Sequence, residues 1–189
     1  MTIRIATILG TGRPGSYTAK ALALAEAELD TMELEVARIR PGDFDLRFPG
    51  EGTGDQERLQ ELVSSATALL FATPEYHGTM AAKAKLIIEN LGFPSVVAGK
   101  PVALLGAAAG SIGAIKSLEQ LRSCLSHTGA IVLPGPVSVA GVRKVFDEEG
   151  RCHDEGVEKR IRGLSRGLVD YVHQNICPRL ALETQVRIP

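Results

Sequence analysis

Residues 10–18 concentrate groups that bind anions. The segment reads Gly-Thr-Gly-Arg-Pro-Gly-Ser-Tyr-Thr, with hydroxyls at Thr11, Ser16 and Thr18 and a guanidinium at Arg13. Hydroxyls donate hydrogen bonds to phosphate oxygens, and a guanidinium makes stronger, charge-assisted ones. If a helix begins where the segment ends, its free N–H groups and the positive end of its dipole attract the same anion. The segment therefore predicts a phosphate-binding loop.

The glycines of this loop match known nucleotide-binding patterns only in part. Gly10, Gly12 and Gly15 resemble the dinucleotide pattern Gly-x-Gly-x-x-Gly, but no Gly-Lys-Ser/Thr follows as in a Walker loop. The alternative is an ordinary tight turn from a strand into a helix, with Ser16 as the helix cap. The glycine spacing alone leaves both interpretations open.

Two further loops contain planar or small groups. Residues 73–79 read Thr-Pro-Glu-Tyr-His-Gly-Thr, and residues 106–113 read Gly-Ala-Ala-Ala-Gly-Ser-Ile-Gly. A glycine beside an aromatic side chain lets the backbone approach a ligand, and a run of small residues lets a flat ring lie against the main chain. Together with the first loop they suggest a ligand with a phosphate and a planar heterocycle. Taken singly, Tyr76 fits a surface aromatic, His77 fits a turn, and the small residues fit close helix–strand packing.

These loops need strands that end at one edge of a sheet. Continuous apolar runs predict buried parallel strands, and the alternation of residues 32–39 predicts an outer one. The predicted strands are residues 3–9, 32–39, 68–73, 101–106 and 130–133. A loop rich in glycine, proline and charge spans residues 41–54.

Segments with apolar residues at helical spacing lie between the predicted strands and after the last one. Helices are predicted after residue 18, after the capping residue Asp55, over residues 80–91, from residue 115 to about 129, and over residues 157–172. The fold class is therefore α/β: one doubly wound domain over residues 1–189, with a five-stranded parallel sheet and helices on both faces. The strand count favours the flavodoxin order over the six-stranded dinucleotide fold, and such sheets bind ligands at the carboxyl ends of their strands. The three loops lie there.

The predicted helix over residues 80–91 is apolar on more than one face. It contains Leu86, Ile87, Ile88 and Leu91 besides three alanines. Packing on one sheet needs a narrower apolar stripe, so the excess predicts a subunit contact. We expect a homodimer or a dimer of dimers.

Composition excludes several classes of protein. With 21 Lys and Arg against 22 Asp and Glu and no dense basic run, we expect no nucleic-acid partner. No apolar stretch approaches the ~18 residues of a membrane span, and no secretory signal is apparent. Three widely spaced cysteines, Cys124, Cys152 and Cys177, suit neither disulfides nor a metal or iron–sulfur site. They predict free thiols and a cytoplasmic location.

The residues discussed above resemble the NADPH-dependent FMN reductases, flavodoxin-like proteins that include quinone, azo and chromate reductases. The likeness runs from residue 3 to the last helix. It rests on residues 10–18, with Thr11 where the family has Ser, on Pro-Glu-Tyr-His-Gly at 74–78, and on Gly-Lys-Pro-Val-Ala at 99–103. The sequence departs from the family at His77, usually Asn, and at residues 80–82, where a Pro-Gly or Pro-Ala pair is common.

The resemblance implies a cofactor, FMN, and a reductant, NADPH or NADH. Hydride would pass from NAD(P)H to bound FMN and then to a small-molecule electron acceptor: a quinone, flavin, azo compound or metal oxyanion. No catalytic side chain is expected because the flavin N5 carries the chemistry, although His77 is a candidate contact for the acceptor. The implied phosphate ligands are Thr11, Arg13, Ser16 and Thr18. The ribityl chain and ring would lie along Pro74, Glu75, Tyr76, His77 and Gly78, and the isoalloxazine would border Gly110, Ser111 and Gly113.

Three other functions fit the same pattern of residues. A flavodoxin-type electron carrier shares the fold, but carriers are usually acidic around the flavin, whereas the calculated pI here is about 6.4. A flavin-binding redox sensor would retain the ring contacts without turnover. A nucleotide-binding α/β enzyme would ignore flavin altogether. The acceptor and the choice between NADPH and NADH stay open.

Overall fold

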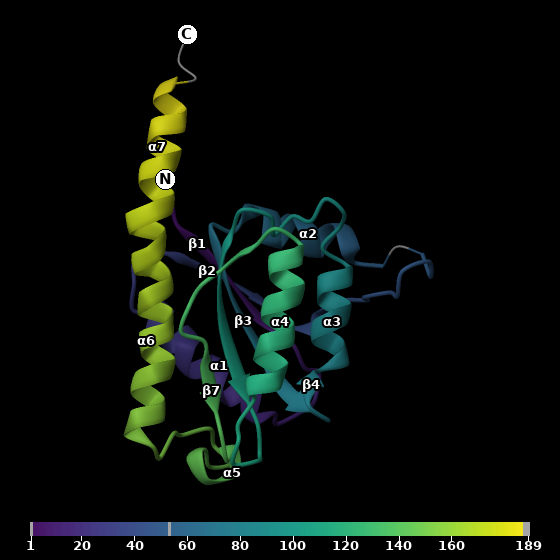
Figure 1. Ribbon diagram of the computed structural model, residues 1–189, viewed down its shortest axis with the longest axis vertical. Helices are drawn as coiled ribbons and strands as arrows, with labels where there is room; N and C mark the ends of the chain where they lie inside the picture. Colours follow the sequence, from purple (N-terminus) through teal and green to yellow (C-terminus); the bar gives the residue numbers. More distant parts are fainter. Residues whose placement is uncertain (1, 53, 187–189) are drawn as a thin grey trace.

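The computed structural model describes residues 2–52 and 54–186, and its centre is a parallel sheet (Figure 1). Five strands follow the order β2-β1-β3-β5-β6, which confirms the doubly wound, flavodoxin-like fold. They are β1 (Arg4–Leu9), β2 (Glu35–Ile39), β3 (Ala68–Tyr76), β5 (Pro101–Ala107) and β6 (Ile131–Val132). Two short strands complete the sheet: β4 (Thr79–Met80) pairs antiparallel with β3, and β7 (Val137–Val139) pairs with β5 beyond the end of β6.

Helices cover both faces of this sheet. One face packs against α1 (Tyr17–Leu29) and α6 (Glu155–Tyr171), and the other against α2 (Gln56–Ser65), α3 (Ala82–Glu89) and α4 (Ile115–His127). Alternate side chains of β1 enter the two cores, because successive residues of a strand point to opposite faces. Shorter elements are the 3-10 turn η1 (Pro41–Asp43) and α5 (Val142–Val145). After α6 come the π-helical turn η2 (Val172–Ile176) and α7 (Cys177–Val186).

Several predicted boundaries were wrong. Residues 74–76, predicted as loop, extend β3, because β4 folds back on them as a hairpin. The fifth predicted strand, residues 130–133, is the two-residue β6, and β7 beyond the exposed Pro-Gly-Pro excursion at 134–136 was not predicted. The outer strand begins at Glu35 rather than at residue 32, and α3 begins at Ala82.

Asp55 does not cap α2, as the sequence had suggested. Its carboxylate Oδ2 accepts a hydrogen bond from the Asp45 N–H at 2.8 Å, and its N–H donates to the Asp45 carbonyl at 2.9 Å. The residue therefore closes the base of the 45–55 loop. This position of the carboxylate directs it to the Asp45 N–H, and it makes no capping hydrogen bond to α2.

The apolar side chains of α3 are buried within the single chain. Ile87 and Leu91 are fully buried and Ile88 nearly so, in the core that they share with residues of α2 and α4, and Leu86 is only 5% exposed. The apolar side chains that predicted a subunit contact along this helix are thus buried within the chain itself, without a partner subunit. Dimerisation stays a prediction, but this argument for its location does not hold.

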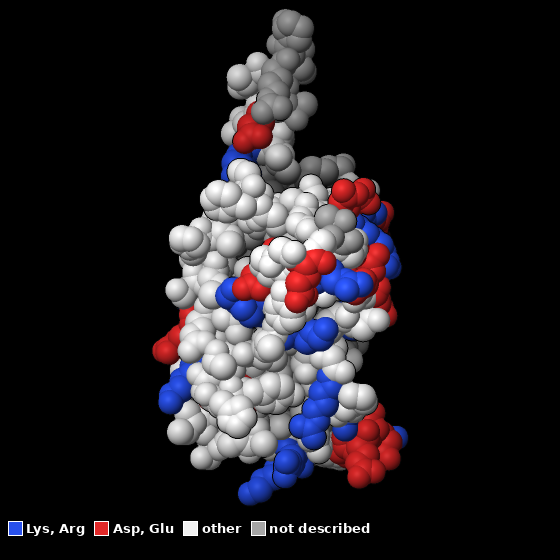
Figure 2. Space-filling view, turned by 90° about the vertical axis from the view of Figure 1, so that its right-hand side faces the viewer, with Lys and Arg blue, Asp and Glu red and all other residues white. Residues whose placement is uncertain are grey.

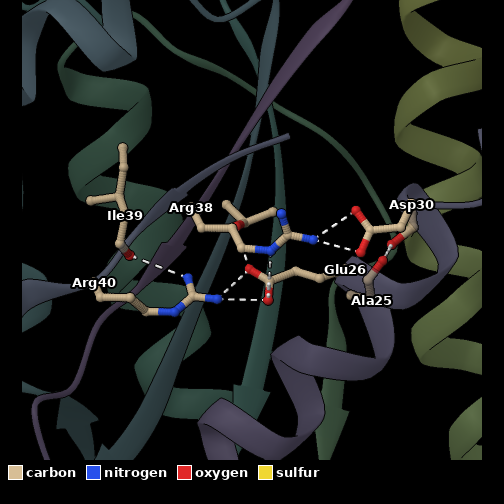
Figure 3. A network of polar contacts seen from close by, with 8 residues as sticks. Ala25, Glu26, Asp30, Arg38, Ile39 and Arg40 are labelled. Carbon is tan, nitrogen blue, oxygen red and sulfur yellow. Dashed lines mark hydrogen bonds and ion pairs between the residues drawn. The ribbon is translucent and has the colours of Figure 1, made fainter. Parts of the chain in front are cut away.

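A buried carboxylate joins α1 to β2 on the outer edge of the sheet (Figure 3). The Glu26 side chain is 7% exposed and receives two hydrogen bonds from the Arg40 guanidinium, at 2.5 and 2.6 Å. Arg38 lies 3.6 Å away and also binds Asp30, and the buried Thr7 hydroxyl donates to Glu26. Buried charges persist where such partners surround them.

Charged side chains on the face shown in Figure 2 are of both signs. Basic groups lie toward the lower end, where β4 and α5 lie in Figure 1, with acidic groups beside them. No helix in the described part of the chain is long and apolar enough to cross a membrane.

Candidate functional site

Three loops and one helical turn meet at the carboxyl ends of the parallel strands, around a cleft of about 230 Å³. This position agrees with the prediction for the three loops at residues 10–18, 73–79 and 106–113, which lie at the carboxyl ends of β1, β3 and β5 and are called loops one, three and four below. The lining residues come from the β1–α1 loop, the end of β3, the segment after β5, and α5: Arg13, Pro14, Gly15, Ser16, Tyr17, Thr18, Pro74, Glu75, Tyr76, Ala107, Ala108, Ala109, Val142 and Arg143. A larger cavity lies beside α6, but it contains none of the predicted site residues.

The first loop is organised by its own hydroxyl groups. Ser16 Oγ accepts the Thr18 N–H at 3.2 Å, so Ser16 does cap α1, as the alternative interpretation proposed. Thr11 is buried outside the cleft lining, and its Oγ1 accepts the Arg13 N–H at 3.3 Å. Each hydroxyl still has a proton to donate. The remaining N-terminal N–H groups of α1 have no carbonyl one turn earlier to accept them, so an anion can use them.

Two arginines line the cleft without acidic partners among the described residues. Arg13 comes from the first loop and Arg143 from α5, and both are exposed. Two unpaired guanidiniums beside a helix N-terminus favour an anion with more than one negative charge. Arg143 was missed from the sequence because α5 is a four-residue turn with no periodicity to reveal it.

Glu75 lines the same cleft, but its carboxylate has a partner. Its Oε2 accepts the Ser117 N–H at 3.1 Å, in the first turn of α4. A carboxylate at a helix N-terminus is stabilised by the dipole. The N-terminus of α4 therefore binds a carboxylate of the chain itself. The N-terminus of α1 lines the cleft, together with Pro74 and the 37% exposed Tyr76.

His77 and Gly78 form the two-residue turn between β3 and β4 and do not line the cleft. Their φ angles are 51° and 75°, the left-handed values that tight hairpins require. The alternative interpretation of His77 as a turn residue is confirmed for its backbone. An Asn, which adopts this conformation readily, would serve the same turn.

Loop four contributes its first half to the cleft. Ala107, Ala108 and Ala109 line it, whereas Gly110, Ser111 and Gly113 do not. The Gly110 carbonyl instead accepts the N–H groups of Gly113 at 3.3 Å and Gly141 at 3.0 Å. This closure fixes the residue before α5, so loop four positions Arg143.

The 99–103 segment lies at the opposite end of the sheet. Lys100 Nζ donates to the carbonyls of Ser64 at 2.9 Å and Ala66 at 2.6 Å, at the C-terminal end of α2. Desolvation by burial lowers the pKa of this lysine. Lys100, in the segment that resembles the family, therefore has a structural role. It places a positive charge at the C-terminal end of α2, which stabilises that helix.

The position of the first loop depends on Gly10. A Cβ at Gly10 would lie 2.8 Å from both the Ala72 carbonyl oxygen and the Ala84 Cβ, whereas one at Gly12 meets nothing within 4 Å. We expect Gly10→Ala to lower the free energy of unfolding by about 1–3 kcal/mol through overpacking. Gly12→Ala should change it by less than about 0.5 kcal/mol. Urea denaturation compares the two, and equal losses would contradict this role of Gly10.

The cleft fits an FMN molecule in the chemistry of its donors. Cations, hydroxyls and helical N–H groups lie around α1, where a phosphate dianion would be stabilised. Small residues at 107–109 and the Pro74–Tyr76 strand end provide main chain and an aromatic ring for a flat heterocycle. No acid–base pair is needed in such a site, because the cofactor performs the redox chemistry.

Comparison with known proteins finds the same class. A family model for NADPH-dependent FMN reductase matches residues 3–143. An NAD(P)H-dependent FMN reductase of Pseudomonas aeruginosa is 34% identical over 170 residues, which is 85% of this chain and 90% of that protein. An NADPH azoreductase of a Bacillus species is 29% identical over 186 residues, 96% of this chain and all of that protein. In fold, the chain is similar to FerB of Paracoccus denitrificans, a flavoenzyme NAD(P)H:(acceptor) oxidoreductase, with a TM-score of 0.78, 22% identity, and coverage of 92% of this chain and 98% of that one.

Proposed function

The chain belongs to the NADPH-dependent FMN reductase family, and on that premise we propose that it binds FMN in the cleft above α1 and transfers hydride from NAD(P)H to a planar organic acceptor. The observation that carries the proposal is the meeting of Arg13, Arg143 and the N-terminus of α1 in one cleft with the ends of β3 and β5. We propose that residues 1–189 form one FMN-binding domain. We also place it in the reducing cytoplasm, in keeping with its three free thiols.

The residues of the chain have distinct tasks in this proposal. Arg13, the Ser16 hydroxyl and the first-turn N–H groups of α1 hold the phosphate. Arg143 adds a second positive charge from α5. Pro74, Tyr76 and residues 107–109 hold the ring, and the hydrogen bond from Ser117 to Glu75 keeps that carboxylate in place. Bound FMN supplies the capacity to accept a hydride and pass it on.

Apolar planar acceptors suit the surface around the cleft. Tyr76 is 37% exposed, and in loop four and the start of α4 Ile112 is 73% and Ile115 48% exposed. Exposed apolar side chains grouped near a cleft favour a substrate with apolar surface. The name of the Bacillus relative, an azoreductase, supports the same class, and we propose quinones and azo compounds as acceptors.

A flavodoxin-type electron carrier is the second candidate, and the cleft charges argue against it. A carrier recruits basic protein partners through an acidic surface around the flavin. Here the cleft contains two arginines without acidic partners in the described part of the chain, and its one carboxylate, Glu75, is bound to α4. A small-molecule acceptor fits this electrostatic environment better.

The function is tested by anaerobic reduction of the FMN-loaded protein. We expect a flavin visible spectrum that NADPH or NADH bleaches and that a quinone or azo dye restores, over many turnovers. An electron carrier would show the flavin spectrum with negligible NAD(P)H oxidation. A protein that stays colourless with added FMN would contradict the proposal.

A further inference from the structure

Residues 146–152 form a short hairpin directly after α5, called the Asp147 hairpin below. Its two ends pair as an antiparallel bridge. Inside it, the Asp147 carboxylate accepts the Arg151 N–H at 2.7 Å, and the Asp147 carbonyl accepts the Gly150 N–H at 3.3 Å. The hairpin is therefore a closed unit, and it begins three residues after Arg143 of the cleft.

Lys20 ties this hairpin to α1. Its Nζ donates a hydrogen bond to the Asp147 carbonyl at 2.6 Å, across 127 positions of the sequence. The stem of the same side chain lies close to the hairpin, because a Cβ at Gly150 would be 3.6 Å from the Lys20 Cγ. A hydrogen bond from a cation is about twice as strong as one between neutral groups. A charge-assisted bond therefore joins the start of α1 to the segment that follows α5.

The Lys20 ammonium is held from a second side by Tyr17. Its Nζ lies 4.7 Å from the centre of the Tyr17 ring, within the range of a cation–π interaction. Tyr17 lines the cleft in the first turn of α1, whereas Lys20 is not among the lining residues. The ammonium group therefore lies between a wall of the cleft and the Asp147 hairpin, without reaching the cleft itself.

Arg143 stands between two anchored segments. Before it, the Val142 N–H donates to the Ala108 carbonyl of loop four at 3.1 Å. After it, Val145 is buried in the same core as α1, and the Asp147 hairpin follows. An exposed side chain keeps a fixed direction only if its backbone is held at both ends. Loop four holds the start of α5, and the bond from Lys20 holds the hairpin at its end.

We propose that Lys20 is a positioning residue for the phosphate site, which holds Arg143 in place toward the phosphate by tying the Asp147 hairpin to α1. The proposal rests on the binding of FMN in this cleft, as argued above. A binding group that is already in place loses less conformational entropy when its ligand arrives. Loss of the tie should therefore weaken binding of the phosphate, although Lys20 itself does not line the cleft.

Titration of the apoprotein with FMN and with riboflavin, the flavin without a phosphate, tests this role by flavin fluorescence. We expect Lys20→Met to raise the dissociation constant of FMN about fivefold and to leave that of riboflavin unchanged, because Arg143 acts on the phosphate. Lys20→Arg keeps a charged donor and should bind FMN within about twofold of the unaltered protein. Equal losses for FMN and riboflavin, or no rescue by arginine, would overturn the proposal.

A double-mutant cycle separates positioning from a direct effect of charge. Arg143→Ala should raise the dissociation constant of FMN about tenfold or more, since it removes a charge-assisted contact to the phosphate. Adding Lys20→Met to Arg143→Ala should raise it further by less than about twofold, because the side chain that Lys20 positions is already gone. If the charge of Lys20 acted on the phosphate directly, the two losses would add in full, and the proposal would be wrong.

Lys159→Met is the matched control, because Lys159 is an exposed lysine of α6 outside the cleft lining. It removes the same charge and should leave FMN affinity unchanged. Hydrogen exchange of the apoprotein adds a readout without flavin: Lys20→Met should speed exchange of the Gly150 N–H about fivefold or more, and Lys159→Met should not. An unaltered protein that binds no FMN would overturn the proposed function and this role with it. Unchanged affinity or exchange in Lys20→Met, in a protein that binds FMN, would overturn the role of Lys20 alone.

Discussion

Arg13→Ala is expected to weaken FMN binding by ~1.5 to 3 kcal/mol, about 10- to 150-fold in the dissociation constant. The guanidinium is exposed in the cleft with no acidic partner in the described structure, so its full charge is available to the phosphate. Quenching of flavin fluorescence on titration of the apoprotein measures the change. The loss should shrink at high salt, because part of it is electrostatic.

Arg151→Ala is the control for this measurement. Arg151 is also exposed, but it does not line the cleft, and its bonds to Asp147 are made by its backbone. Its removal should leave FMN affinity unchanged. If Arg13→Ala bound FMN as tightly as the unaltered protein, the assigned role of Arg13 would be refuted.

Glu26→Ala is expected to lower the free energy of unfolding by about 3 kcal/mol, the low end for breaking a buried ion pair. The side chains of Arg38 and Arg40 are 42% and 29% exposed, so both retain some water when the carboxylate is removed. The buried Thr7 hydroxyl, by contrast, loses its acceptor. At about 2–4 °C per kcal/mol, the melting temperature should fall by about 6–12 °C.

Glu35→Ala removes a carboxylate of the same type from an exposed pair. Glu35 is 52% and its partner Arg4 38% exposed, so this change should cost at most about 1 kcal/mol. Calorimetry of the two variants under one buffer gives the comparison. Similar losses for both would show that burial of Glu26 contributes little.

Strong periodicity predicted the fold well, and irregular segments account for what was missed. Continuous apolar runs gave β1, β3 and β5, since parallel strands are buried on both faces. The excursion at 134–136 concealed β7, because two prolines interrupt the strand pattern. The last helix was predicted to end near Val172, but η2 and α7 continue it. Pro178, a residue that ends or kinks helices, falls just after the π-helical turn η2, and the helix continues past it.

Residues of the cleft could be predicted from the sequence where several binding groups stand close together in one loop. Arg13, Ser16, Thr18, Pro74, Glu75 and Tyr76 do meet in one cleft, because strand ends determine where their loops go. The sequence could not show that Ser117 would bind Glu75, or that a single turn at α5 would bring in Arg143 from residues far along the chain. His77, Gly78 and the second half of loop four lie outside the cleft lining, because turn closure takes their backbone. Their roles toward FMN stay predictions.

The most direct measurement of the central claim is a crystal structure of the protein with FMN. We predict the phosphate within hydrogen-bond distance of the first-turn N–H groups of α1 and of the Arg13 guanidinium, with the isoalloxazine against residues 74–76 and 107–109. FMN density elsewhere in the molecule, or a first loop free of phosphate at saturating FMN, would contradict the account.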